Sequence, residues 1–200
     1  MTTKQINALV EDIRKFRWDT LIKNQFDDVL GDCVDWYTAD ATGLIVEFGR
    51  KQVTEEELTF LLSRKLASLG CGVITIGRKR EPGIGADFLI VTRTSITLVQ
   101  AKMVRAERQW KSFKSKSEQY DNLYRIREKL QACFHRHVNA IYLRYKHPRE
   151  GAIKALLQLH YIEVTDTEPD DDALVDWQFL SEFSIIPPPP LCTHRIKVKK

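Results

Sequence analysis

Polar side chains stand at the ends of two apolar runs within residues 83–102, GIGADFLIVTRTSITLVQAK. Asp87 opens the first run, and Gln100 and Lys102 close the second. Because successive side chains of a strand point to opposite faces, Gln100 and Lys102 share one face. A hairpin with its two-residue turn at 93–94 would place Asp87 directly opposite Gln100, with Cβ atoms ~5 Å apart. The pattern therefore predicts one polar site at one end of a sheet.

A carboxylate, an amide oxygen and an ammonium group in one place suit metal-assisted hydrolysis. Carboxylate and amide oxygens are hard donors that Mg²⁺ accepts as ligands. The metal can turn a water into a nucleophile and stabilise negative charge on a phosphate. A lysine can hold that water or neutralise the developing charge. A strand-start aspartate is by itself most often a turn or cap residue, so the combination carries the prediction.

The helix expected from Thr54 carries a run of glutamates in its first turn. Thr54 and Glu57 have the spacing of a capping box, which explains Glu57 without any catalytic role. Glu55 lies on the same helix face as the apolar stripe, which must turn towards the sheet, whereas Glu56 points about 100° away. That stripe comprises Leu58, Leu62 and Leu66.

The elements around the hairpin follow an α/β order. We expect a helix over residues 4–30, a possible short strand within 32–50, and a polar loop at RKREPGIG before the hairpin. The remaining expected elements are a helix at 54–69, strands at 73–76 and 138–145, a helix at 106–131 and a short helix at 151–159 followed by YIEV. This order predicts a central mixed β-sheet flanked by helices.

The motifs EEELTFLLSRKLASLG, GAD and QAK, in that order, resemble the PD-(D/E)xK nuclease superfamily. Its members carry a glutamate on a helix, an acid at a strand start, and (E/Q)xK at the end of the next strand. The glutamine of QAK is similar to that of Mrr-like restriction endonucleases, while GAD lacks the proline of the family motif. The resemblance covers about residues 55–145.

The resemblance implies a role for each matching residue. Asp87 would be the central metal ligand, and Gln100 would be the second ligand through its side-chain oxygen. The backbone carbonyl of Ala101 would complete the coordination sphere, and Lys102 would be the catalytic lysine. Glutamine in place of glutamate removes one negative charge, so the ion should be held more weakly and the helix glutamate matters more.

The helix glutamate and a supporting glutamine also follow from the resemblance. Related members place the glutamate three residues before the first helix leucine, which selects Glu55 and leaves Glu56 as the reserve. Gln119 falls where some members have a supporting glutamine on the helix after the lysine.

The resemblance also implies a fold, a cofactor and an activity. It implies a restriction-endonuclease-like core (αβββαβ) over residues 51–162, with an N-terminal helical extension, 1–50, packed on that core. Residues 163–200 would form an acidic loop, a Pro-rich segment and a basic tail. The implied activity is Mg²⁺-dependent cleavage of DNA, with Mn²⁺ as a substitute, in defence against foreign DNA. A duplex cutter usually needs two active sites, so a homodimer or a partner protein is expected.

Basic residues flank the predicted site on both sides. Between Lys102 and Lys116 six basic residues face one acid, Glu107. Such runs are usually solvated helix faces, but their position beside the site favours contact with phosphates. The residues expected to contact nucleic acid are Arg78, Lys79, Arg80, Arg105, Arg108, Lys111 and Lys114.

Two other functions remain open from the residues alone. The glutamine and the missing proline also fit a non-catalytic nucleic-acid-binding or assembly module that kept the fold. A nuclease acting on RNA is a further option. CFHRH, residues 133–137, has metal-binding residue types, but Cys133, His135 and His137 cannot face one way on a helix, so a basic helix end fits better.

Composition sets the outer limits. The chain has 200 residues, of which 43% are hydrophobic, and a net charge of +4, which permits a nucleic-acid partner without requiring one. Its four cysteines are far apart and form no CxxC pair, which favours reduced thiols in the cytoplasm. No apolar run has the length of a membrane span, so no membrane partner is expected.

Overall fold

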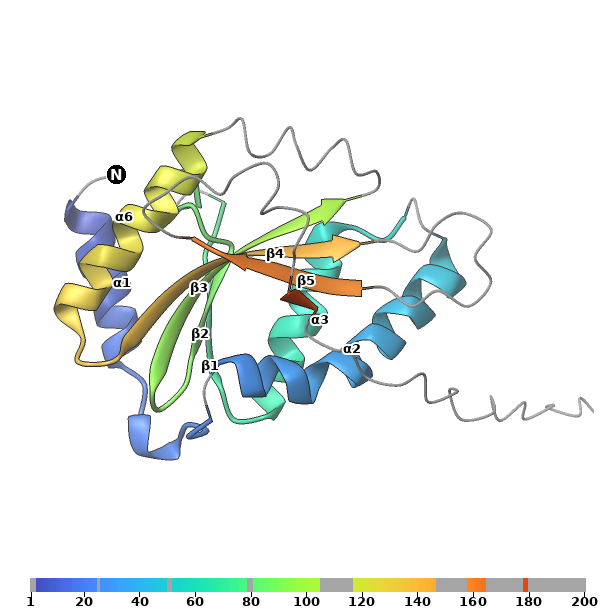
Figure 1. Ribbon diagram of the computed structural model, residues 1–200, viewed down its shortest axis with the longest axis horizontal. Helices are drawn as coiled ribbons and strands as arrows, with labels where there is room; N and C mark the ends of the chain where they lie inside the picture. Colours follow the sequence, from blue (N-terminus) through green and yellow to red (C-terminus); the bar gives the residue numbers. More distant parts are fainter. Residues whose placement is uncertain are drawn as a thin grey trace, which may run out of the picture.

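A mixed α/β architecture is seen in the computed structural model, with helices on both faces of one sheet (Figure 1). This confirms the coarse fold class predicted from the order of elements. The structure describes residues 3–24, 26–49, 52–78, 81–104, 117–146, 158–164 and 178–179. The predicted Pro-rich segment, the basic tail and the acidic run beyond Val164 lie outside these residues.

The strands pair in the order β1-β2-β3-β4-β5-β6. β3 and β4 are parallel, and the other neighbouring pairs are antiparallel. The parallel pair is joined by the helix α6, since parallel neighbours need a long crossover connection. The strands are β1 (Gly72–Thr75), β2 (Phe88–Val91), β3 (Ser95–Val104), β4 (His137–Lys146), β5 (Gln158–Glu163) and β6 (Gln178–Phe179).

Each face of the sheet is buried under a different pair of helices. α1 and α6 cover one face and α2 and α3 cover the other, on the left and right of Figure 1. β2 is buried along both faces, which is why its sequence is continuously apolar rather than alternating. The helices are α1 (Thr3–Arg14), α2 (Phe26–Phe48), α3 (Glu55–Ser68), the single turn α4 (Glu81–Ile84) and α6 (Ser117–Cys133).

The β2–β3 hairpin has the predicted register. Phe88 pairs with Val99, and the Thr92 amide donates to the Ser95 carbonyl at 2.9 Å, which leaves residues 93–94 as the turn. The turn lacks the Gly or Asn that a primed turn prefers. Instead, the Thr92 hydroxyl accepts the Ser95 amide at 3.0 Å, so a side chain stabilises the turn.

The prediction for the N-terminal region was wrong in two places. The helix expected over residues 4–30 ends at Arg14, and a 3₁₀ turn (Trp18–Thr20) follows. The backbone of Ile22 instead bonds to the Gly70 carbonyl at 2.9 Å and to the Arg93 amide at 2.8 Å, which a continuous helix would prevent.

The strand expected within residues 32–50 is helix α2, which runs through Gly31. Ala41 and Ile45, four residues apart, are both buried against the α3 side of the sheet. This tertiary packing outweighs the helix cost of about 1 kcal/mol for a glycine and the strand preference of β-branched residues.

The other predicted elements agree in part. The strands at 73–76 and 138–145 are confirmed as β1 and β4, whereas RKREPGIG, expected as a loop, contains the turn α4. Of the helix expected at 106–131, α6 begins at Ser117, and residues 106–116 lie outside the described part. The short helix expected at 151–159 also lies mostly outside it, and residues 158–159 belong to β5.

The sheet also extends past the expected core boundary at residue 162, because β6 pairs with β5. Among the helices that the structure describes, none combines the length and the apolar character needed to cross a bilayer.

Candidate functional site

Asp87 lies one residue before β2 and binds the far end of β3. Its Oδ2 accepts a hydrogen bond from the Ala101 amide at 2.6 Å and another from Gln100 Nε2 at 2.6 Å. The Asp87 amide donates to the Val99 carbonyl at 2.8 Å, so the hairpin ladder continues to this residue. Asp87 and Gln100 therefore meet across the hairpin, as the alternation of side chains predicted.

The Gln100 side chain is fully buried, and both ends of its amide are engaged. Nε2 donates to Asp87 and, at 3.2 Å, to the Ala101 carbonyl. Oε1 accepts a hydrogen bond from Gln119 Nε2 at 2.6 Å. Because the Asp87 carboxylate and the Ala101 carbonyl are acceptors, Gln100 faces them with its Nε2 donor, and its oxygen is left to accept from Gln119.

Gly85, the glycine of GAD, allows α6 to come close enough for this contact. A Cβ on Gly85 would lie 2.7 Å from the backbone oxygen of Gln119 and 3.0 Å from the Leu123 nitrogen. Gly85 also has a φ of 77°, a left-handed conformation that other residues rarely adopt. Asn122 Nδ2 adds a hydrogen bond to the Pro82 carbonyl at 3.2 Å, which fastens α6 to the same loop.

Glu55, at the start of α3, reaches the end of β3 from the other face of the sheet. Its Oε2 accepts the Met103 amide at 2.5 Å, and its Oε1 lies 3.9 Å from Lys102 Nζ. Both side chains are largely shielded from solvent, with exposed fractions of 33% for Glu55 and 16% for Lys102. The acid on helix α3 and the lysine of QAK therefore belong to one site.

The neighbouring glutamates point elsewhere. Glu56, the reserve candidate, is exposed and pairs with Arg78. Glu57 forms the predicted capping box with Thr54: its backbone amide donates to the Thr54 hydroxyl at 3.2 Å, and its carboxylate accepts the Thr54 amide at 2.7 Å. The leucine stripe is buried as expected, so the face argument correctly separates Glu55 from its neighbours.

Burial makes both carboxylates of the site hard to ionise. Desolvation raises the pKa of Asp87 from 3.8 to about 7, although the Ala101 amide and Lys102 oppose the shift. Desolvation also raises the pKa of Glu55, with Lys102 and the Met103 amide acting in the other direction. Repulsion from Glu81 adds to both shifts, repulsion from Glu55 adds to that of Asp87, and repulsion from Glu56 adds to that of Glu55. The site therefore favours the arrival of further positive charge.

Sequence reasoning missed Tyr142, which lies beside Gln100 on the adjacent strand β4. Its ring stacks on Tyr120 of α6 with centroids 6.0 Å apart. Burial, followed by the neighbouring Tyr120 and the Asp87 charge, raises the pKa of the Tyr142 hydroxyl. The alternation of side chains along residues 142–145, YLRY, places Tyr142 on the sheet face that α6 covers. This pattern could have identified Tyr142 from the sequence.

The predicted nucleic-acid contacts are mostly outside the described residues. Arg78 is described and forms the exposed pair with Glu56. The others, Lys79, Arg80, Arg105, Arg108, Lys111 and Lys114, lie outside the described residues.

Neither protein-family models nor curated proteins match this chain. Within the described residues, no three His, Cys, Asp or Glu side chains gather as a metal-binding group. The predicted ligand set has only two carboxylates, Asp87 and Glu55, and relies on the Ala101 carbonyl for a further oxygen.

Proposed function

We propose that this chain is a metal-dependent DNA endonuclease with a restriction-endonuclease-like core, a member of the superfamily that its motifs resemble. The main support is the meeting of Asp87, Glu55 and Lys102 at one end of β3. These residues come from separate motifs, and the two outermost, Glu55 and Lys102, are 47 positions apart in the sequence. A purely structural role would not require an acid from each of two elements beside one lysine.

The donor chemistry of the site fits Mg²⁺. The Asp87 and Glu55 carboxylates and the Ala101 carbonyl are hard oxygen donors, and the raised pKa of Asp87 marks a carboxylate that lacks sufficient positive charge nearby. These groups would hold Mg²⁺, with Mn²⁺ as a substitute. Gln100 would act differently from the expectation, by donating to Asp87 while its oxygen accepts from Gln119.

Each residue then has a physical role in phosphodiester cleavage. When bound, Mg²⁺ supplies a Lewis acid that lowers the pKa of a water and balances charge on the phosphate. Gln100 and the Ala101 amide hold the Asp87 carboxylate in one orientation. Lys102, held near Glu55, donates to the oxygen on which negative charge develops. The buried wall of Tyr142 and Leu98 excludes water beneath these groups.

DNA is the proposed substrate because of the basic residues that follow the QAK motif in the sequence. Residues 102–116 carry six basic side chains and one acid, and phosphate neutralisation by Lys and Arg supplies most of the affinity for DNA. Cutting both strands of a duplex needs two such sites, so we expect a homodimer or a partner protein on DNA.

The test is a cleavage assay on supercoiled, linear and single-stranded DNA and on RNA, with Mg²⁺ or Mn²⁺. We expect the unmodified protein to cut DNA, and Lys102→Ala and Asp87→Ala to lose about 10²- to 10³-fold of the rate, as for loss of a major charge-stabilising group. Arg64→Gln is the control, since it removes an exposed charge from α3 away from these groups. Intact DNA with either metal, or unimpaired cutting by the two variants, would refute the proposal.

A non-catalytic DNA-binding module is the second candidate. It is favoured by the engagement of the Gln100 oxygen with Gln119, which withdraws one expected ligand. Calorimetric titration with Mn²⁺ separates the two functions. No Mn²⁺ binding, together with DNA binding that weakens as salt rises, would favour the binding module.

A further inference from the structure

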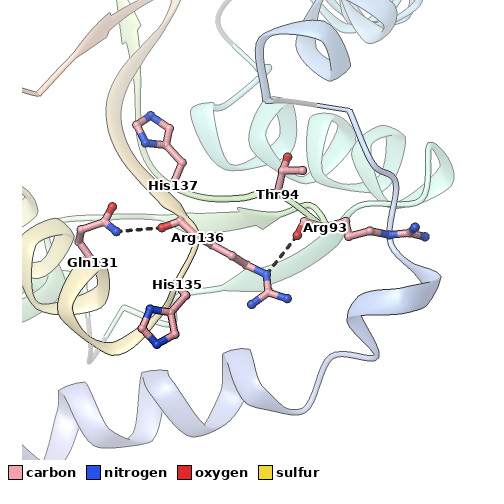
Figure 2. A pocket seen from close by; sticks show the side chains of 6 residues that line it. All are labelled: Arg93, Thr94, Gln131, His135, Arg136 and His137. Carbon is pink, nitrogen blue, oxygen red and sulfur yellow. Dashed lines mark hydrogen bonds between the residues drawn. The ribbon is translucent and has the colours of Figure 1, made fainter.

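An open polar depression, called the cavity below, lies at the opposite end of the β2–β3 hairpin from Asp87. Its volume is about 630 Å³, and it opens between the hairpin turn and the connection from α6 to β4 (Figure 2). Asp87 is six residues from Arg93, or ~20 Å along an extended strand, so the cavity is a separate place on the molecule. The lining residues are Arg93, Thr94, Gln131, His135, Arg136 and His137.

Hydrogen bonds between the two loops preform this cavity. The His137 amide donates to the Thr94 carbonyl at 3.2 Å, and Arg136 Nε donates to the Arg93 carbonyl at 3.1 Å. Gln131 holds the connection from the α6 side, because its Nε2 donates to the Arg136 carbonyl at 2.9 Å (Figure 2). The same side chain accepts the amide of the first buried β4 residue at 3.0 Å. The loops therefore need little rearrangement when a ligand binds.

Arg136 is held as a ready donor in this cavity. Its guanidinium lies 3.9 Å from the centroid of the Trp18 ring, and Nε is bonded to the hairpin turn. Among the described residues, no acceptor contacts its two terminal nitrogens. A guanidinium fixed by stacking and by Nε presents these two donors to a planar pair of oxygens, the geometry in which arginine binds phosphate.

The charge around the cavity is one-sided. Its lining contains no carboxylate, and Arg136 is its facing cation, because the Arg93 guanidinium points away and donates to the Asp19 and Leu21 carbonyls (Figure 2). Asp19 follows Trp18, the ring on which Arg136 rests. Its exposed carboxylate pairs with Arg17 and does not line the cavity. The depression is open to solvent, and its volume of about 630 Å³ leaves room for a phosphate with an attached group.

We propose that this cavity binds a phosphate group, carried either by a free nucleotide or by a nucleic-acid strand. Arg136 makes the bidentate contact, and His135 is a further donor at the rim. The site needs no metal, because its cations are supplied by the protein. It is independent of the proposed nuclease activity, and either can fail without the other.

The first experiment uses the unmodified protein in EDTA, with amide NMR spectra recorded during titration. The probes are inorganic phosphate, a nucleoside monophosphate, and one short single-stranded oligonucleotide with and without a 5′-phosphate. We expect shifts at residues 93–95 and 134–138 with little change at Asp87 and Ala101. Tighter binding of the monophosphate identifies a nucleotide site, whereas tighter binding of the oligonucleotide identifies a strand site. Shifts located elsewhere, or none with any probe, would overturn the proposal.

The second experiment compares variants by calorimetry with the tightest probe. Arg136→Gln should weaken binding at least 10-fold, and His135→Ala, at an exposed position, about 3-fold. Arg64→Gln is the matched control, because Arg64 also rests on an aromatic ring, Phe60, at 5.9 Å, but on α3 across the sheet. If Arg136→Gln unfolds, His135→Ala alone decides. Equal affinity of the cavity variants and the control would show nonspecific attraction to a basic protein and would end the proposal.

Discussion

The two ends of the β2–β3 hairpin differ in charge and in burial. At the strand-start end, buried acids and amides meet: Asp87 and Gln100 lie between helices on both faces, and Glu55 arrives from α3. At the turn end, exposed basic residues such as His135 surround a cavity, and Arg136 rests on an aromatic ring. The carboxylates of the first end are desolvated by burial, whereas basic side chains of the second end are exposed to solvent.

This contrast separates two ways of preparing a polar site. The acidic end depends on burial, so its properties follow from the packing of α3 and α6 and change with pH. The basic end depends on backbone hydrogen bonds between loops, so its properties follow from loop geometry. Variants that disturb packing should therefore affect the acidic end, and variants that disturb the loops should affect the basic end.

The largest expected effect is the pH dependence caused by Asp87. Its pKa of about 7 in the folded protein exceeds the ordinary value of 3.8, so the folded chain keeps this proton when the unfolded chain has lost it. The free energy of unfolding should therefore fall as pH rises from about 4 to about 7, by up to ~4 kcal/mol. Asp87→Asn should remove most of this fall, as measured by urea unfolding in EDTA at several pH values.

Glu55, whose pKa is also raised, should leave a smaller fall of the same sign in Asp87→Asn. Mg²⁺ should restore stability to the unmodified protein above pH 7, because an ion that binds only the folded state stabilises it. Arg136→Gln, at the basic end, should leave the pH dependence unchanged. A flat stability profile for the unmodified protein would contradict the buried charge at Asp87.

The next effect is the close approach at Gly85. Gly85→Ala should lower the free energy of unfolding by about 3 kcal/mol, because it combines a left-handed φ with a Cβ 2.7 Å from the Gln119 carbonyl oxygen. Gly77→Ala is the matched control, since a Cβ there meets nothing within 4 Å, and should change stability by less than ~0.5 kcal/mol. Equal effects in thermal unfolding would show that α6 does not depend on this glycine.

The two ends each have a glutamine, and these can be exchanged for leucine in parallel. Gln119→Leu leaves the buried Gln100 oxygen without its donor and should cost about 2 kcal/mol of stability. If Mn²⁺ binds at Asp87, its affinity should also fall 10- to 100-fold, as for loss of an outer hydrogen bond.

Gln131→Leu should cost less, about 1 kcal/mol, because the Arg136 carbonyl is exposed to water and the Val138 amide is partly buried. It should weaken phosphate binding and leave Mn²⁺ affinity unchanged. Calorimetric titration of Gln119→Leu and Gln131→Leu with Mn²⁺ and with phosphate measures all four affinities. Loss of Mn²⁺ binding in Gln131→Leu would mean that the two ends are not independent.

The smallest effect concerns the ring contact of Arg136. Trp18→Leu should reduce stability by more than the contact alone, so Arg136→Gln is the better probe, with an expected cost of ~1 kcal/mol for a partly exposed cation–π pair. Arg64→Gln, with its longer contact to Phe60, should cost less. Chemical unfolding at one pH measures both, and a larger cost for Arg64→Gln would contradict the ranking.

The sequence predicted the parts of the fold that local patterns control. The hairpin register followed from alternation and a two-residue turn, and Thr92 supplied the turn stabilisation that a glycine would normally give. The break after Arg14 and the helix through Gly31 were missed. Both depend on partners distant in sequence, such as the Gly70 carbonyl that accepts the Ile22 amide, which no local pattern reveals.

For the candidate site, too, the sequence predicted which residues meet but not every contact between them. Periodicity placed Asp87 opposite Gln100 and turned Glu55 towards the sheet, and both arrangements are seen. The direction of the Gln100 amide was not predicted, because it depends on the contacts of Nε2 with Asp87 and the Ala101 carbonyl and on the approach of Gln119 from α6. The phosphate cavity was missed as well, since it joins residues 93–94 to the end of α6.

One consequence of α6 concerns how this chain can change length. The helix carries Gln119 near its first turn and Gln131 near its last, and each must face its own partner. Adding or deleting one residue between them would rotate one end by about 100° against the other. The twelve-residue spacing between Gln119 and Gln131 is therefore constrained. An insertion or deletion between them would break the hydrogen bond of one of the two glutamines.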